Sequence, residues 1–418
     1  MVTQKNIFGE QELSPTYSLD DPRTEVYVGD CRDVLAQLPE ESVDLIFADP
    51  PFNWNVPYAD WKDNMKRGDY LEFTYDWLDA CIRVLAPRGS LWVNIPDDSA
   101  AEVVLYLKGR KLQMINWCIW HFRFGQCRDT NFIVSKVHVL YFVRDRKRRI
   151  WNPEEILEPS DRATTYADAR TRKTRRPGMR LPLDVWYGRF WGRVQGNSKE
   201  RRENHQNQIP ETYMERVILA CTDEGDLVLD PFLGSGTTCV VARSLNRQSI
   251  GIEYSSSTAE SSVERIKKGA IRIQTREQRR IELAVQEAYY EVHAGSADDL
   301  IIREDLNAAF IEACRRRIPN AEAEDLNWAL LKVRKSGKLG RVAEKSPRIK
   351  YDAYIEEAAC SAAKQMKAKY KKDLDRIFCN PQLRAEFDEL ARANAPDVEP
   401  YLLRKAALKW RKRRKSDS

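Results

Sequence analysis

The stretch Val43-Asp44-Leu45-Ile46-Phe47-Ala48 is a short apolar run that ends abruptly in Asp49-Pro50-Pro51-Phe52. A second run, Leu227-Val228-Leu229, ends in Asp230-Pro231-Phe232-Leu233-Gly234-Ser235-Gly236-Thr237-Thr238. Short apolar runs bounded by proline and glycine are typical of buried strands. Because polar and turn-forming residues follow each run at once, we expect two parallel strands whose carboxyl ends carry functional groups.

The first two-thirds of the chain repeats this alternation of strand and helix. Further strands are predicted at 25–29, 90–95, 112–120, 136–143 and 249–252, and helices at 70–85, 210–221 and 237–245. This pattern predicts an α/β fold, with a doubly wound, mainly parallel sheet of about seven strands. No helical pattern separates 112–120 from 136–143, so we expect these two strands to form an antiparallel pair at one edge.

Composition bounds the class of protein but not its partners. The chain has 418 residues with 42% hydrophobic content and a net charge of +6, which is enough for two domains and only mildly basic. Nine cysteines occur without any C-x-x-C pair, so no zinc site is predicted. The chain shows no signal-peptide pattern and no apolar run of membrane-spanning length, and we expect a cytoplasmic protein.

Two regions depart from the α/β rhythm. Residues 144–204 are rich in Arg, Pro and Gly without a clear period, which is typical of a functional insert in a domain spanning 24–270. Residues 300–418 are helical and highly charged, and we interpret them as a basic accessory domain. Two helices there, at 307–317 and 322–335, precede a glycine-flanked turn. A winged-helix or helix-turn-helix module is one interpretation, and a plain helical domain is the one we favour.

The glycine-containing run predicts a site for a nucleotide-like cofactor. Gly234 and Gly236 permit a tight turn and close approach to a ligand. Ser235, Thr237 and Thr238 add donors at the start of a helix, where a carboxylate is favoured. Glu253 follows Gly234 by about twenty residues, the spacing at which nucleoside-binding folds place an acid for the ribose.

The Asp49–Phe52 run has the groups needed to hold a planar amino group. The carboxylate of Asp49 and the carbonyl of Pro50 can accept both hydrogens of an exocyclic amine. Such an amine is a weak nucleophile because its lone pair is delocalised, so fixed acceptors that favour a tetrahedral nitrogen stabilise the transition state. Phe52 can stack on a nucleobase that has swung out of its helix.

These two motifs resemble those of the amino-group DNA methyltransferases. Their order, catalytic motif first and glycine loop later, resembles the permuted beta group of that family. Gly29-Asp30-Cys31 resembles its acidic cofactor-contacting element, and His205, Gln208 and Pro210 resemble its H-x-x-Q-x-P element. Asp184-Val185-Trp186 is also similar to a family element. The resemblance covers roughly residues 24–270.

The resemblance implies S-adenosylmethionine as the cofactor, base flipping and no metal. The implied catalytic residues are Asp49, Pro50, Pro51 and Phe52. The implied cofactor-binding residues are Asp30, His205, Gln208, Pro210, Asp230, Phe232, Gly234, Ser235, Gly236, Thr237, Thr238 and Glu253. In the insert, where the family carries its target-recognition region, the expected phosphate contacts are Arg172, Lys173, Arg175 and Arg176. The core packing of Trp186 and Trp191 is favoured over stacking in DNA.

The sequence also departs from the family pattern. Phe52 stands where Tyr is commoner, and Gln206, Asn207 and Ile209 replace the usual Pro, Thr and Lys. Asp rather than Ser at position 49 favours adenine N6 over cytosine N4.

The leading hypothesis is therefore a DNA adenine-N6 methyltransferase that acts on double-stranded DNA. A cognate restriction endonuclease and a homodimer are left open as partners. The alternatives are an N4-cytosine DNA methyltransferase, an RNA or protein amine methyltransferase, an inactive DNA-binding member of the fold, and a fusion with a nuclease.

Overall fold

The computed structural model describes residues 14–58, 60–122, 129–166, 168–188, 191–194, 196, 198–202, 205, 207–292, 296–339 and 351–416. The chain divides into two compact units, which are described separately. Unit 1 comprises residues 1–156 and 182–275, and unit 2 comprises residues 157–181 and 276–418. The segment 157–181, which the sequence places inside the expected insert, therefore belongs with the C-terminal helices.

Unit 1 is built on one nine-stranded sheet of order β1-β2-β11-β10-β3-β4-β6-β5-β9. The strands are β1 (Tyr17–Leu19), β2 (Thr24–Val28), β3 (Val43–Ala48), β4 (Leu85–Ile95), β5 (Gln113–His121), β6 (Lys136–Val143), β9 (Val185–Trp186), β10 (Leu227–Asp230) and β11 (Gln248–Glu253). The five strands from β2 to β4 in this order are mutually parallel, and β6 is antiparallel to both β4 and β5.

The predicted α/β fold with its antiparallel edge is confirmed, and the seven predicted strands are all present. Two short edge strands, β1 and β9, bring the total in the sheet to nine. They are three and two residues long, too short to leave a period in the sequence.

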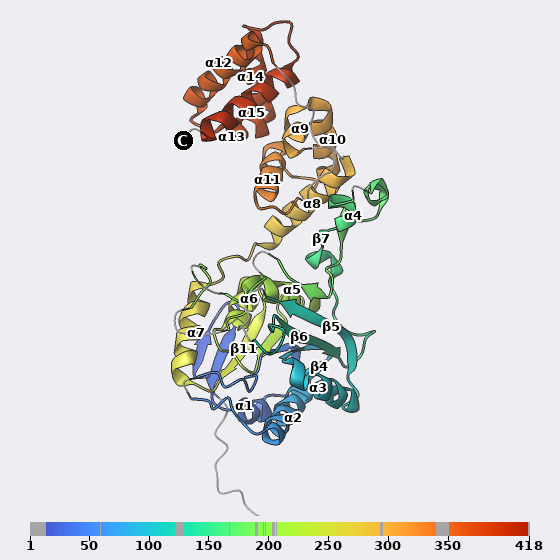
Figure 1. Cartoon of the computed structure of the whole chain (residues 1–418), viewed down its shortest axis with the longest axis vertical. Helices are drawn as coiled ribbons and strands as arrows, with labels where there is room; N and C mark the ends of the chain where they lie inside the picture. Colours follow the sequence, from blue (N-terminus) through green and yellow to red (C-terminus); the bar gives the residue numbers. More distant parts are fainter. Residues whose placement is uncertain are drawn as a thin grey trace, which may run out of the picture. The chain divides into compact units, whose positions relative to one another are not determined.

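Helices cover both faces of the sheet (Figure 1). The helices of unit 1 are α1 (Cys31–Gln37), α2 (Arg67–Val84), α3 (Asp97–Gly109), α5 (Glu211–Cys221), α6 (Thr237–Ser244) and α7 (Ser256–Lys268), with a 3-10 turn, η1 (Pro153–Ile156). The central strand β3 shows the two-sided burial: Ile46 packs into the cluster with α1 to α3, whereas Leu45 and Phe47 pack into the cluster with α5 and α6. Burial on both faces explains why β3 is a continuous apolar run and does not alternate.

Unit 2 is mainly helical. Its helices are α4 (Asp161–Thr164), α8 (Arg276–Val292), α9 (Ala297–Ile302), α10 (Glu304–Arg315), α11 (Ala323–Lys335), α12 (Ala353–Tyr370), α13 (Leu374–Cys379), α14 (Pro381–Arg392) and α15 (Pro400–Ser416). The segment 157–181 adds a 3-10 helix, η2 (Ala169–Lys173), and a two-stranded sheet of β7 (Glu158–Pro159) and β8 (Met179–Arg180). The expected C-terminal helical domain is confirmed, and its described residues 296–339 and 351–416 contain helices and no strand.

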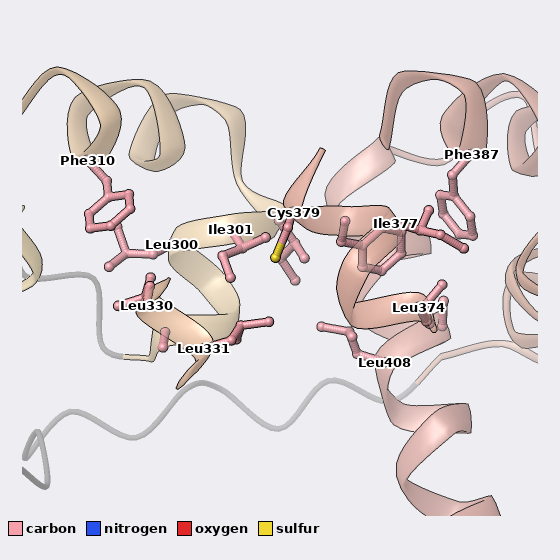
Figure 2. Close-up of a cluster of buried hydrophobic side chains, with 14 of the residues drawn as sticks. Leu300, Ile301, Phe310, Leu330, Leu331, Leu374, Ile377, Cys379, Phe387 and Leu408 are labelled. Carbon is pink, nitrogen blue, oxygen red and sulfur yellow. The ribbon is translucent and has the colours of Figure 1, made fainter. Parts of the chain in front are cut away.

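One apolar cluster holds unit 2 together. In Figure 2, Leu300 and Leu331 lie to one side of Cys379, and Ile377 and Leu374 lie to the other. All five residues belong to one buried cluster. Segment 157–181 joins this core through Ala163 and Met179, which are buried with Tyr290 of α8. A Cβ on Gly178 would lie 2.1 Å from the Tyr290 ring, so the segment approaches α8 more closely than any other residue would allow.

Two absences apply only to the part of the chain that the structure describes. No helix there is both long and apolar enough to cross a membrane. No group of three or more His, Cys, Asp or Glu residues is placed to hold a metal ion.

Candidate functional site

Four acidic residues lie in a row at one edge of the sheet of unit 1. Asp49 follows β3, Asp230 ends β10, Glu253 ends β11, and Asp30 lies just after β2. These four strands are parallel neighbours in the order β2-β11-β10-β3. Adjacent strands are about 4.8 Å apart, so the row spans roughly 14 Å.

A cavity of about 260 Å³ opens along this row. Of the residues expected to act, those that line it are Asp30, Asp49, Pro50, Pro51, Phe52, His205, Gln208, Asp230, Phe232, Gly234, Ser235, Thr237, Thr238 and Glu253. Pro210 and Gly236 are outside its wall, because Pro210 caps α5 and Gly236 caps α6. The structure therefore brings both sequence motifs to one space at the carboxyl ends of parallel strands.

The two glycines of the loop have different structural roles. Gly236 has φ +76°, and a Cβ there would lie 3.1 Å from the Cβ of Ser262 on α7. It lets the chain turn into α6 while α7 packs close behind. Gly234 has φ +48°, and a Cβ there would lie 3.1 Å from Cε1 of His205. Gly234 thus makes room for the His205 imidazole beside the loop.

Asp230 braces the start of this loop. Its carboxylate accepts hydrogen bonds from Thr238 Oγ1 at 2.6 Å and from the backbone N–H of Phe232 at 3.0 Å. Burial raises the pKa of Asp230 to about 7, although both of these bonds favour the ionised form. Because both carboxylate oxygens have a partner within the loop, the geometry makes Asp230 a support for the turn.

Glu253 and Asp30 face the cavity from neighbouring strands. Glu253 accepts from the N–H of Gly234 at 2.9 Å and from the N–H of Ser255 at 3.0 Å. Its pKa is raised by burial. Asp30 caps α1 and is paired with Arg32, whose hydrogen bond lowers the pKa of the Asp30 carboxyl. Carboxylates in such fixed positions are suited to accept from ligand hydroxyl groups.

Arg265 on α7 is a supporting residue that the sequence did not reveal. It is 5% exposed and donates to the carbonyl of Ser235 at 3.1 Å and to Oγ1 of Thr237 at 2.7 Å. It also pairs with Glu211 at 3.3 Å, and Glu211 is fully buried. The guanidinium therefore ties the glycine loop to both α7 and α5. Arg265 lies 29 residues beyond Gly236 in a run of charged residues, which resembles an exposed helix face in sequence.

The segment before α5 contributes two cavity residues of different character. Burial lowers the pKa of His205 to about 4, so its imidazole is neutral at physiological pH. Gln208 is 1% exposed, and its side-chain amide donates to the carbonyl of Glu200 and accepts from the N–H of Arg202. Gln208 thus braces the preceding residues 198–202, a role that its spacing from His205 did not reveal.

At the other end of the row, Asp49 is held by a chain of hydrogen bonds. Asn94, near the end of β4, donates to Oδ1 of Asp49 at 3.0 Å. Tyr213 on α5 donates its hydroxyl to Oδ1 of Asn94 at 2.7 Å, which fixes the orientation of the Asn94 amide. Burial raises the pKa of Asp49 to about 6, while Asn94 and the positive charge of Arg193 act in the opposite direction.

The loop after Phe52 is organised by one buried carboxylate. Asp63 is 4% exposed and accepts backbone N–H bonds from Asn53 at 2.7 Å, Trp54 at 3.0 Å and Val56 at 3.0 Å. This arrangement presents Trp54 and Tyr58 at the cavity, where both remain partly exposed. Neither was expected, because the loop carries no periodic signal.

Other cavity-lining residues were also absent from the sequence expectations. They include Trp61, Phe73, Trp120, Val137, Arg193, Tyr254, Ser255 and Thr258. Trp61 packs against Phe73 and Tyr254 with ring centroids 5.0 and 5.7 Å apart, which forms an aromatic wall. The two tryptophans weighed earlier, Trp186 and Trp191, pack on Tyr213 in the core of unit 1.

The four residues expected to contact phosphates belong to unit 2, whereas the cavity described above is lined by residues of unit 1. Lys173 and Arg175 are exposed, and Arg176 is partly buried. Arg172 lies in η2, and its side chain is outside the described part. Gln206, one of the departures from the family pattern, is also outside the described residues.

Comparisons with known proteins agree with this geometry. A family model described as DNA methylase matches residues 43–264, a range that contains both motifs. The chain belongs to the DNA methylase family. Members of this family depend on S-adenosylmethionine as the methyl donor.

Curated relatives of the DNA methylase chain are similar over somewhat more than half of it. The type II methyltransferase M.BamHI of Bacillus amyloliquefaciens is 36% identical over 249 residues, which cover 58% of this chain and 57% of that protein. M.HpaI of Haemophilus parainfluenzae is 32% identical over 233 residues, or 56% of this chain and 70% of that one. The DNA adenine methyltransferase YhdJ of Escherichia coli (strain K12) is 32% identical over 253 residues, or 58% and 82%.

Two solved structures are also similar to this methylase chain. PvuII DNA methyltransferase, titled cytosine-N4-specific, has a TM-score of 0.45 at 16% identity and covers 70% of this chain and 93% of its own. The M1.HpyAVI–SAM complex has a TM-score of 0.42 at 18% identity and covers 58% and 98%.

Proposed function

We propose that this chain transfers a methyl group from S-adenosylmethionine to the N6 amino group of adenine in double-stranded DNA, after the base has left the helix. One observation carries the proposal: Asp49 and the Gly234 loop line a single cavity. An amine acceptor and a cofactor loop in one space place a nucleophile and a methyl donor within reach of each other.

The loop end of the cavity suits the cofactor in chemistry and shape. Asp30 and Glu253 offer acceptors for ribose hydroxyls, and Trp61 and Tyr254 offer flat apolar surfaces for a purine ring. When bound, S-adenosylmethionine supplies an electrophilic methyl group on a sulfonium sulfur. Neutral His205 would not repel that positive charge.

The Asp49 end would hold the amine. Asn94 occupies Oδ1 of Asp49, and Oδ2 has no hydrogen-bond partner among the described residues, so Oδ2 can accept from the base. In the transfer the N6 lone pair would form the new N–C bond as the S–C bond breaks and the sulfur leaves as a neutral thioether. The proton that N6 then loses would pass to solvent water. An ionised Asp49 stabilises the positive charge that develops on N6.

Adenine is favoured over cytosine by two considerations. Asp at position 49 is the residue that the family resemblance associates with adenine N6. The relative YhdJ, named a DNA adenine methyltransferase, is 32% identical over 253 residues. An N4-cytosine activity is the alternative, since the same acceptors would hold a cytosine amine.

Unit 2 is proposed to hold the DNA. The net charge of +6 conceals an uneven division, because unit 2 contains 38 Lys and Arg and 27 Asp and Glu, whereas unit 1 contains 31 and 36. Unit 2 therefore has a formal charge of +11 and unit 1 of −5. Unit 2 therefore attracts a polyanion, whereas unit 1 repels it. Arg172, Lys173, Arg175 and Arg176 are the proposed phosphate contacts within unit 2.

Salt dependence of DNA binding tests the role of unit 2. The variant Lys173→Ala/Arg175→Ala should weaken binding to all sequences equally and reduce the slope of log Kd against log salt by about 2. The matched control, Lys108→Ala/Lys111→Ala, removes two exposed lysines of unit 1 and should leave the slope unchanged. Equal slopes in the two variants would refute this assignment.

The activity itself is tested in cells. The chain is expressed in a bacterial host without DNA methyltransferases, and the host DNA is sequenced for modified bases. N6-methyladenine in one short sequence context is the expected result, and it would also identify the target site. The names of M.BamHI and M.HpaI as type II enzymes lead us to propose a cognate restriction endonuclease, which should be blocked by that modification. N4-methylcytosine would overturn the choice of base, and unmodified DNA from a well-expressed protein would overturn the activity.

A further inference from the structure

Arg193 projects into the Asp49 end of the cavity from the segment between β9 and α5. Two hydrogen bonds that involve its backbone hold this segment. Trp120 donates from Nε1 to the carbonyl of Trp191 at 2.5 Å, and the N–H of Val194 donates to the carbonyl of Gln208 at 3.1 Å. Arg193 lies between these two anchors and lines the same cavity as Asp49.

The Arg193 guanidinium has a defined orientation. Its Cζ lies 4.3 Å from the centre of the buried Phe122 ring, and Nη1 donates to Oδ1 of Asn207. Asn207 in turn hydrogen-bonds with Tyr58, which also lines the cavity. A cation stacked on one ring and held at one nitrogen loses little further freedom when it binds a ligand.

Most donors of Arg193 remain unused. A guanidinium carries five N–H donors, and only Nη1 has a hydrogen-bond acceptor among the described residues. Nε is buried and has no hydrogen-bond partner within the described part of the chain. Leaving a buried donor without an acceptor is unfavourable, so an arrangement that is only structural would leave this donor unexplained.

Arg193 and Asp49 carry opposite charges, yet no hydrogen bond or ion pair joins these two described residues. They nevertheless interact electrostatically across the cavity, since the Arg193 charge lowers the pKa of Asp49. An acceptor and a donor thus face one space without satisfying each other. A flat group that offers a donor next to an acceptor would satisfy both.

We propose that Arg193 determines base specificity by donating a hydrogen bond to the ring nitrogen next to the exocyclic amine of the target base, while Asp49 accepts from that amine. This inference rests on the proposed function. Adenine presents N6–H beside the unprotonated N1, and cytosine presents N4–H beside the unprotonated N3. Guanine and thymine carry N–H at the corresponding ring position and a carbonyl in place of the amine. The pair Asp49 and Arg193 therefore accepts the two bases with an amine and rejects the other two.

The test replaces single atoms of the target base. Unmethylated duplexes that contain the target sequence carry adenine, 1-deazaadenine (N1 replaced by C–H) or 7-deazaadenine at the position that the protein methylates. Wild-type protein and Arg193→Met are compared by kcat/KM for each duplex. In the variant, the kcat/KM for the 1-deazaadenine duplex divided by that for the adenine duplex measures the intrinsic effect of the lost ring nitrogen.

Replacing adenine by 1-deazaadenine should lower the kcat/KM of wild-type protein by roughly 10- to 100-fold more than that of the variant, because wild-type protein alone loses a charged hydrogen bond. The 7-deazaadenine duplex is the matched control and should give equal ratios in both proteins. If the 1-deazaadenine ratios are equal, the proposal is wrong. If the protein methylates cytosine and not adenine, 3-deazacytosine takes the place of 1-deazaadenine in the same comparison.

Two further measurements keep the outcome unambiguous. Arg193→Met should retain S-adenosylmethionine affinity and melting temperature, since Arg193 is proposed to contact the base only. If Arg193→Met does not fold, wild-type protein alone decides: a loss on 1-deazaadenine no larger than on 7-deazaadenine overturns the role of Arg193. Absence of methyl transfer from wild-type protein to any DNA would instead refute the proposed function.

Discussion

The side-chain amide of Asn94 donates a hydrogen bond from Nδ2 to Oδ1 of Asp49 at 3.0 Å. Asn94 lies on β4, and Asp49 directly follows the adjacent parallel strand β3. The contact follows from the register of the sheet, in which Ala48 pairs with Val93. It occupies one carboxylate oxygen and leaves the other without a hydrogen-bond partner among the described residues. Because Tyr213 fixes the amide in turn, the orientation of Asp49 is set before any substrate arrives, which is the preorganisation that catalysis needs.

Loss of this contact should slow methyl transfer without loss of the cofactor. Asn94→Ala removes the donor to Asp49 and should lower kcat by roughly 10- to 100-fold. Tyr213→Phe removes only the hydroxyl that orients Asn94, and about a tenfold loss is expected. Ser90→Ala, a buried position on the same strand that contacts Tyr141, is the control. Steady-state kinetics with unchanged cofactor affinity would support the account, and full activity in Asn94→Ala would contradict it.

Activity should fall on the acid side as Asp49 becomes protonated. The ionised carboxylate is the form that stabilises the positive charge developing on the amine, and its pKa is raised to about 6. Below that value kcat should fall about tenfold per pH unit. Asp230 interacts electrostatically with Asp49, and burial raises its pKa to about 7. The other groups that face Asp49 are Asn94, Arg193, Tyr58 and Tyr213, and none of them titrates between about pH 5 and 8. Asp230→Asn separates the two groups, because the limb near pH 6 should persist in it.

The same buried charge should cost stability. The pKa of Asp49 is raised to about 6 in the folded protein, so the folded state keeps a proton that the unfolded chain has already lost near pH 4. Stability is therefore greatest below pH 4 for this group and declines as pH rises to about 6. At pH 8, Asp49→Asn should abolish methyl transfer and raise the free energy of unfolding by up to about 3 kcal/mol. Chemical denaturation checks this, and a marked loss of stability would contradict it.

Arg265 should prove essential to the glycine loop. Arg265→Ala removes its bonds to Ser235 and Thr237 and leaves Glu211 buried without its partner. Breaking a buried pair in this way costs about 3–5 kcal/mol, and cofactor affinity should fall with it. Lys268→Ala, an exposed position on the same helix, should change neither quantity. Calorimetry and thermal melting distinguish the two variants, and equal behaviour would show that the loop holds its shape without Arg265.

Gly236 should tolerate no side chain, for a reason different from the one its motif implies. Gly236→Ala places a Cβ at φ +76° and 3.1 Å from Ser262, so the loop and α7 must separate. We expect a loss of about 1–2 kcal/mol from the backbone conformation alone, together with weaker cofactor binding. Gly68→Ala in α2, where a Cβ meets nothing within 4 Å, is the control. Normal stability in Gly236→Ala would contradict the packing account.

The sequence foretold the sheet well because its central strands are buried on both faces. The predicted bounds of 43–48 and 136–143 coincide with β3 and β6, since continuous apolar runs mark such strands clearly. Strand β4 begins five residues before its predicted start and includes Pro87 and Gly89. Both residue types argue against a regular strand, and both lie in the irregular stretch between the pairs Val43–Leu85 and Leu45–Ser90, where the register shifts.

The site was predictable only where a motif names its residues. Asp49 and Glu253 follow strands and carry recognisable neighbours, whereas Asn94, Arg193 and Arg265 act through long-range contacts that no local pattern encodes. Segment 157–181 illustrates the same limit at the level of units. Its packing on α8 depends on Gly178 meeting Tyr290, two residues more than a hundred positions apart, so its membership of unit 2 could not be read from the sequence.

The most direct test of the central claim is mass spectrometry of nucleosides from DNA incubated with purified protein and S-adenosylmethionine carrying a ¹³C-labelled methyl group. Wild-type protein should place the label in N6-methyladenine, and Asp49→Asn, which retains the cofactor site, should place none. Label in N4-methylcytosine would contradict the choice of base. Equal labelling by wild-type protein and Asp49→Asn would contradict the central claim that Asp49 and the glycine loop form one methyl-transfer site.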